Sequence, residues 1–90
     1  SEPAPLVFQH LNDAQGLRQA TDTGSMLMQR AQAQGLSDVN VIGPAPGVPF
    51  RIRGRYRWHL ILNGRGLLRF IEGMEFPQGC TVDVDPAHVL

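Results

Sequence analysis

The chain has 90 residues, of which 42% are hydrophobic and 18% charged, and its formal net charge at neutral pH is zero. This length fits one small domain, and the ordinary apolar content argues against a disordered chain. A single cysteine cannot build a disulfide framework or a cysteine-rich zinc site. No apolar run approaches the ~18 residues of a membrane span. We therefore expect one cytoplasmic domain over residues 1–90, with no membrane contact.

The first third of the chain predicts a strand followed by a long helix. Two prolines predict an extended lead-in over residues 1–5, and residues 6–11 form a short strand candidate. From residue 13 to about residue 34, apolar side chains recur at the spacing of a helix, which Gly35 would end. The apolar stripe contains Leu17, Ala20, Gly24, Leu27 and Ala31. Gly24 indicates a close approach between this helix and a sheet.

The rest of the chain predicts three strands and a second helix. The candidates are a strand at 39–42, a stiff proline-rich loop at 43–49, a strand at 51–62, a short helix at 64–72 and a strand at 80–84. In the helix, Leu67, Leu68 and Ile71 would point inward. In the last strand, Cys80 would be a small core residue. This order of strand, helix, strand, strand, helix, strand is typical of an α+β two-layer sandwich. We expect a four-stranded, mainly antiparallel sheet with both helices on one face.

Arginines alternate with other residues at the start of the third strand candidate. Because successive side chains of a strand point to opposite faces, one strand here would present a basic face and a core face. The basic face would carry Arg51, Arg53, Arg55, Arg57 and His59, and the core face Ile52, Tyr56, Trp58, Leu60 and Leu62. Gly54 is compatible with a bulge that would shift Arg51 and Arg53 relative to the later arginines.

Two interpretations of the basic face are open. Charged strand faces are common, so the arginines could be solvated or paired with neighbouring acids. Alternatively, they could bind phosphate or carboxylate groups, which the forked guanidinium fits well. Residues 51–69 contain six arginines and no acidic residue. Since Tyr56 and Trp58 are assigned to the core, contact with the phosphate backbone is the expected mode of nucleic-acid binding, rather than base stacking.

Three motifs in order suggest a family. They are Gly43-Pro44-Ala45-Pro46, then Arg53-Gly54-Arg55-Tyr56-Arg57-Trp58 before an apolar run, then Val82-Asp83-Val84-Asp85-Pro86. Together they resemble the C-terminal domain of the PriA (primosomal protein N′) family, the 3′→5′ DNA helicases of bacterial replication restart. The resemblance covers nearly the whole chain. In one departure, His59 stands where the family commonly has glutamine.

The resemblance implies a ribosomal-protein-like sandwich that contacts DNA, the remainder of a helicase chain, and the acidic C-terminal tail of single-stranded DNA-binding protein. In the family, the positions that match Arg55 and His59 receive that tail. Arg55 would be the forked donor for a terminal carboxylate, with His59 as its polar neighbour on the same face. The family's ATP, magnesium and structural zinc are bound elsewhere in the parent protein, so we expect no cofactor and no metal in this chain.

The residues themselves argue against catalysis. A phosphate-binding loop requires a lysine, and the chain has none. The three histidines are scattered, and Asp83 and Asp85 lie in no pattern that indicates an acid–base pair. The alternative to the helicase module is therefore a structural or RNA-contacting αβ sandwich without helicase context.

Overall fold

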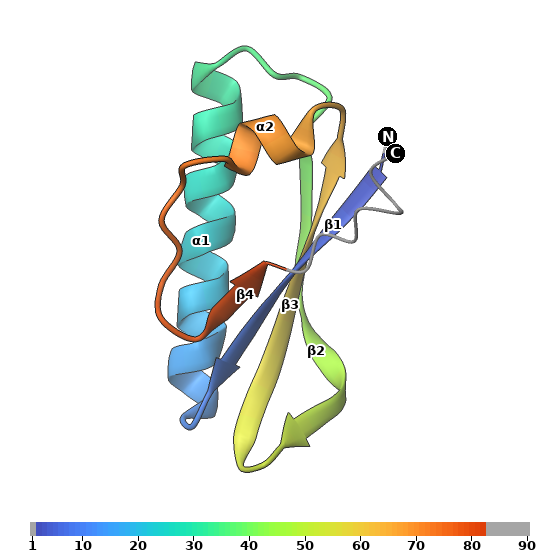
Figure 1. The fold of residues 1–90 in the computed structure, drawn as a ribbon. Coiled ribbons are helices and arrows are strands. Elements are labelled where there is room, and N and C mark those ends of the chain that lie inside the picture. Colours follow the sequence, from blue (N-terminus) through green and yellow to red (C-terminus); the bar gives the residue numbers. More distant parts are fainter. Residues whose placement is uncertain (1, 83–90) are drawn as a thin grey trace.

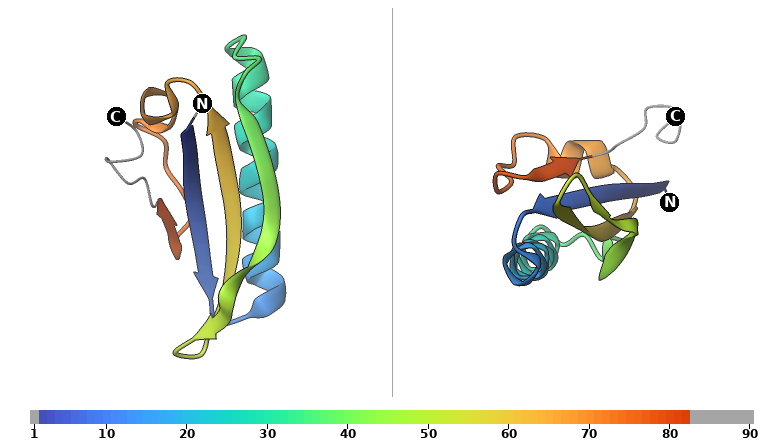
Figure 2. Two further views of the ribbon diagram at one scale, coloured as in Figure 1. Left: turned by 90° about the vertical axis from the view of Figure 1, so that its right-hand side faces the viewer. Right: turned by 90° about the horizontal axis from the view of Figure 1, so that it is seen from below.

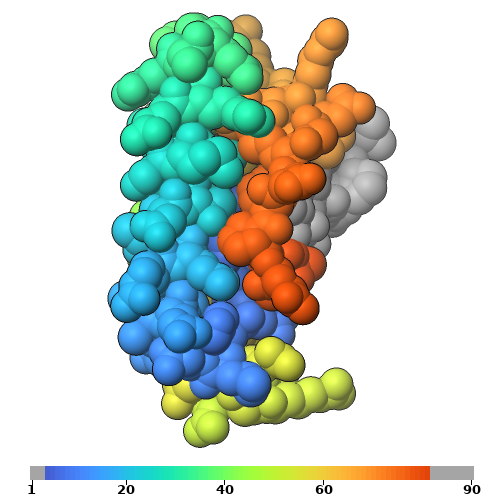
Figure 3. All heavy atoms as spheres, turned by 90° about the vertical axis from the view of Figure 1, so that its left-hand side faces the viewer, coloured from blue at the N-terminus to red at the C-terminus, as the bar shows by residue number. Residues whose placement is uncertain are grey.

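The computed structural model of the protein, which describes residues 2–82, is an antiparallel sheet with two helices packed on one face (Figure 1). In chain order the elements are β1 (Glu2–His10), α1 (Asp13–Ala33), β2 (Asn40–Ile52), β3 (Arg55–Gly64), α2 (Leu67–Ile71) and β4 (Cys80–Val82). The strands lie in the order β2-β3-β1-β4. The predicted α+β sandwich and its order of elements are thus confirmed. Figure 2 shows α1 running along the sheet, and Figure 3 shows α1 beside the α2–β4 segment on the covered face.

Both ends of α1 are capped by local hydrogen bonds. At the start, the Asn12 side chain accepts a hydrogen bond from the backbone N–H of Gln15 at 3.0 Å, which satisfies one of the helix's free donors. At the end, Gly35 adopts a left-handed φ of 70°, and the backbone N–H of Leu36 donates to the carbonyl of Ala31 at 2.9 Å. This 6→1 bond is typical of a Schellman motif. The predicted extent of the helix is therefore correct to within a residue at its C-terminal end.

The core lies between α1 and the two central strands. Its largest fully buried side chains are Phe8, Leu6, Leu27, Leu60 and Leu62. Gly24 is buried against this layer, where an added methyl group would lie 3.5 Å from Leu60. The close approach predicted at Gly24 is confirmed, because even the first carbon of a side chain there would already contact Leu60 of β3 and Val41 of β2. Leu17 does not belong to the buried stripe, since it is 38% exposed near the start of the helix.

The predicted lead-in is wrong, because β1 is a strand from residue 2 onward and pairs with β3 along its whole length. Gln9 donates its backbone N–H toward β4, to the carbonyl of Gly79 at 2.9 Å. N–H directions alternate along a strand, so Pro3 and Pro5 have their nitrogens on the same side as Gln9. In the described chain β4 pairs only with Leu6–Phe8. The missing N–H groups of the two prolines therefore cost no hydrogen bond between the described strands.

The predicted proline loop is also wrong, because residues 43–49 lie within β2. This strand follows β3 irregularly, with shifts in pairing between Ile42 and Ala45 and between Pro46 and Arg51. It lies at the edge of the sheet, where a missing N–H costs little. The sequence argument considered only helix and central strand as alternatives to a loop and therefore missed an edge strand.

The second helix differs from the prediction in one residue that was expected to point into the core. α2 buries Leu67, Phe70 and Ile71, whereas Leu68 is half-exposed. Cys80 packs against the core as predicted. The rest of the expected last strand, with Asp83 and Asp85, lies outside the described residues.

Trp58 joins the far end of the sheet to the start of α1. Its side chain is half-buried, packs against the core and lies 3.3 Å from the position of a methyl group added at Gly16. Its indole Nε1–H donates to the Asp13 carboxylate at 2.9 Å. The assignment of Trp58 to the core face of the strand is correct, although the side chain is only partly buried.

We expect Trp58→Ala to lower the free energy of unfolding by about 3 kcal/mol, because it removes an aromatic side chain between sheet and helix. Trp58→Phe keeps a ring but loses the hydrogen bond to Asp13, and should cost about 1 kcal/mol. Urea unfolding followed by circular dichroism measures both. A Trp58→Ala variant as stable as the parent chain would mean that this contact does not hold the helix.

Candidate nucleic-acid interface

A tight turn divides the arginine-rich segment into two strands. Arg53 and Gly54 have positive φ values of 51° and 76°, and Ile52 pairs with Arg55 across the turn. Two central residues with positive φ are the requirement of a type I′ turn, the preferred two-residue hairpin. The single strand predicted over residues 51–62 is therefore wrong, and its first part belongs to the preceding strand β2.

The turn reverses the faces predicted for the residues before it. Arg51 pairs with Tyr56, and its guanidinium carbon lies 5.1 Å from the centre of the Tyr56 ring. Arg51 is thus on the helix side, away from Arg57. Ile52 pairs with Arg55 and is 39% exposed, so it is not a core residue. From Arg55 onward the alternation is correct, because Leu60 and Leu62 are buried beneath α1.

The resulting feature is a basic hairpin, formed by Arg51, Arg53, Arg55 and Arg57 around the β2–β3 turn. It extends beyond the first turn of α1, as Figures 1 and 3 show. Three of its arginines are exposed, and Arg57 is half-buried with its Nη1 donating to the carbonyl of Pro49 at 2.9 Å. Among the side chains that the structure describes, those of residues 4–81, the one ion pair of an arginine is that of Arg65 with Asp38, at 3.4 Å. The hairpin arginines are therefore available to anionic ligands.

His59 lies on the sheet face opposite the helices, but β2 covers it. A methyl group added at Gly47 would lie 2.8 Å from Nε2 of His59 and 3.1 Å from Cβ of Arg57. Nε2 is buried and has no hydrogen-bond partner among the described residues. Burial, and then the charge of Arg57, lower the pKa of His59 from its ordinary value of 6.5. The lowered pKa disfavours the charged imidazolium, which is the form that would attract an anion.

The structure does not bring Arg55 and His59 together as an accessible pair. Arg55 instead borders a shallow hollow of about 260 Å³ at the end of β1. The other residues around this hollow are Gln9, His10, Leu11, Gln19, Gln78 and Gly79. The side-chain amides and backbone of these neighbours offer hydrogen bonds beside the exposed guanidinium. Any carboxylate bound at Arg55 would thus meet glutamines rather than His59.

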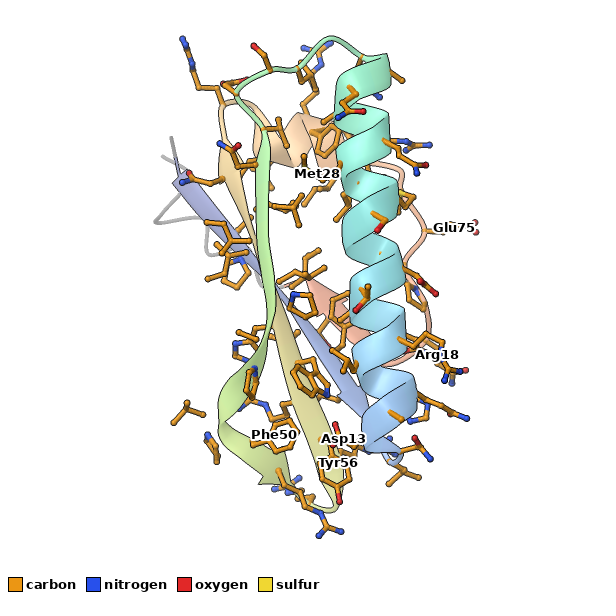
Figure 4. The ribbon with its side chains drawn as sticks, turned by 180° about the vertical axis from the view of Figure 1, so that it is seen from behind. Asp13, Arg18, Met28, Phe50, Tyr56 and Glu75 are labelled. Carbon is orange, nitrogen blue, oxygen red and sulfur yellow. The ribbon has the colours of Figure 1, made fainter. Side chains whose placement is uncertain are left out.

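An aromatic cluster on the other side of the hairpin was not predicted. Phe50 lies 5.4 Å from Tyr56 and 5.2 Å from Trp58, measured between ring centres. Figure 4 shows Phe50 and Tyr56 close to Asp13 at the start of α1. Regular pairing beyond the Arg53-Gly54 turn would set position 50 opposite Arg57, on the face away from the aromatic residues. Phe50 lies in the stretch where the pairing of β2 with β3 shifts, between Pro46 and Arg51, and no local sequence signal predicts that shift.

The described residues contain no group of three histidine, cysteine or acidic side chains that could hold a metal ion. Burial raises the pKa of the Cys80 thiol to about 11, so this cysteine is protonated at neutral pH and is a poor nucleophile. No helix in residues 2–82 has the length and apolar character needed to cross a membrane. A comparison with protein-family models found no match, and neither did a comparison with curated proteins.

The covered position of His59 predicts a pH effect on stability. Because its pKa is lower in the folded chain than in the unfolded one, unfolding takes up a proton at mildly acidic pH. The free energy of unfolding should therefore fall as the pH drops below about 6.5. His59→Gln cannot titrate, so the parent chain should lose stability relative to this variant between about pH 7.5 and about pH 5. Parallel urea titrations of both chains provide the measurement, and an identical pH dependence would show that His59 is not buried as described.

Proposed function

We propose that this chain is a binding module that contacts the phosphate backbone of single-stranded DNA through its basic hairpin. In the wider context given by the resemblance, it would be the C-terminal docking domain of a PriA-type helicase in the cytoplasm, with ATP, magnesium and zinc held by other parts of that protein. The observation that supports this most is the hairpin itself, in which Arg51, Arg53 and Arg55 are exposed and no acidic residue occurs between positions 39 and 71.

Phosphate contact is favoured over a merely solvated surface by the way the charges are distributed. The net charge of the chain is zero, yet four arginines gather at one end of the molecule, where they form no ion pair with the described side chains of residues 4–81. Like charges placed together repel one another and weaken folding unless a ligand neutralises them. A polyanion does so and releases its bound counterions, which is the main source of affinity in sequence-independent nucleic-acid binding.

The turn offers a sharp test, because Arg53 occupies a position with positive φ that asparagine adopts more readily. Arg53→Asn should keep or slightly raise stability while removing one charge, so any lost affinity cannot be attributed to unfolding. For the parent chain, about three neutralised phosphates give a slope near −2 for log K against log salt. Combining Arg53→Asn with Arg55→Gln should bring that slope to about −1.

Fluorescence anisotropy of a labelled single strand over a range of salt concentrations measures these slopes. Arg30→Gln, in the last turn of α1 at the opposite end of the molecule, is the matched control and should leave the slope unchanged. Equal losses in the hairpin and control variants would contradict a localised interface. An RNA strand of the same sequence separates the DNA module from the RNA-contacting alternative, which predicts tighter binding to RNA.

The hollow beside Arg55 favours a second ligand, the acidic C-terminal tail of single-stranded DNA-binding protein. A terminal carboxylate suits the exposed guanidinium, and Gln9 and Gln19 line the same hollow. His59 lies outside this hollow, so the tail would use Arg55 without its expected neighbour. The remainder of the helicase chain would complete the site.

An acidic peptide with a free C-terminus should therefore shift the backbone NMR signals of residues around this hollow. Arg55→Gln should weaken these shifts, whereas Arg30→Gln should not, since it removes the same charge elsewhere. His59→Gln should have little effect because its ring is covered by β2. Shifts centred on the covered face of the sheet, or unchanged by Arg55→Gln, would show that the tail docks elsewhere.

A further inference from the structure

On the helix side of the basic hairpin lie aromatic rings that do not all pack against the hydrophobic core. Of Phe50, Tyr56 and Trp58, only Trp58 packs against the buried cluster beneath α1. Phe50 and Tyr56 are half-buried, as Trp58 is, but they lie at the end of the hairpin near the start of the helix and outside that cluster. Their rings are tilted by 55° to one another, with centres 5.4 Å apart. This arrangement leaves aromatic surface beside the arginines, on the side of the hairpin opposite Arg57.

Arg51 extends this surface. Its guanidinium carbon lies 5.1 Å from the centre of the Tyr56 ring, and the arginine as a whole is exposed. A planar guanidinium over an aromatic ring is a favourable cation–π pair, and both groups can stack against a nucleobase. Tyr56 and Arg51 thus provide two planar groups at the edge of the hairpin, and Phe50 supports the ring from beside it.

We propose that Phe50, Arg51 and Tyr56 form a stacking platform for a base of a single-stranded nucleic acid. This inference rests on the proposed function and adds to it a second mode of contact. Phosphates would bind the exposed arginines at the turn, while one base of the same strand lies against the platform. The earlier expectation that base stacking is absent depended on placing Tyr56 in the core, whereas in the structure Tyr56 is only partly buried and lies outside the core cluster.

Charge complementarity is the reason to choose a nucleic acid as the occupant. Arg53 lies in the turn next to the platform, and Arg55 lies on the opposite face of the same hairpin. A ligand whose anionic backbone follows the turn while a flat ring lies on the helix side therefore fits the hairpin best. A nucleotide has this composition. The strand must be single, because the bases of a duplex are already stacked on each other. Since every base has an aromatic face, such binding tolerates any sequence.

The test compares two single strands of about twelve nucleotides, one of thymidine and one in which the bases are absent but the phosphates remain. Both should bind with the same dependence on salt. The thymidine strand should bind about tenfold more tightly, because only it can stack. Trp58, the only tryptophan, lies 5.2 Å from Phe50, so its fluorescence should respond to thymidine and not to the abasic strand.

Tyr56→Leu keeps an apolar side chain in the strand and removes the ring. It should abolish the preference for thymidine and leave binding of the abasic strand unchanged. Phe76→Leu, which removes an aromatic ring that packs against the core elsewhere, is the matched control and should retain the preference. The comparison of the two strands on the parent chain needs no variant, so it stands even if Tyr56→Leu folds poorly.

The outcomes separate this inference from the function on which it rests. Equal, salt-dependent affinity for both strands would overturn the stacking platform and leave phosphate binding intact. Failure to bind either strand would overturn the proposed function itself. A preference for thymidine that survives Tyr56→Leu would show that bases are bound elsewhere and would also overturn the platform.

Discussion

The burial of one face of β1 and β3 against α1 is the interaction on which the rest of the structure depends. Leu6 and Phe8 from β1 and Leu60 and Leu62 from β3 are fully buried there, beneath Leu27 and its neighbours in the helix. A shift of either strand by one residue would turn all of these side chains to the other face. The register is therefore fixed, and it determines which side chains of β3 remain for binding.

The sequence was sufficient for those parts of the fold in which the pattern repeats. The spacing of apolar residues in α1 and the alternation after Arg55 predicted the helix and the inner face of β3 correctly. The turn between β2 and β3 could not be predicted from such a repeating pattern. A type I′ turn is usually signalled by asparagine or glycine at its first position, and here arginine occupies it. The arginine alternation continues through the turn, so the pattern gave no sign that the strand ends.

The same turn explains why the candidate site was predicted only in part. Arg51 moves to the aromatic side of the hairpin, and Arg55 and Arg57 keep the face that alternation assigns to them. The covering of His59 by Gly47 could not be foreseen, because it depends on the path of an irregular edge strand. Long-range placement of this kind depends on pairing shifts between β2 and β3, which no local spacing encodes.

The prolines of β2 have a consequence for the behaviour of the domain in concentrated solution. An edge strand with free N–H and C=O groups can accept a strand from another molecule and begin an extended intermolecular sheet. Pro44, Pro46 and Pro49 interrupt the row of donors along this edge, and the pairing shifts bend it out of line. A second copy therefore finds no continuous template there. The domain is therefore protected from aggregation through this edge at high concentration, despite its small core.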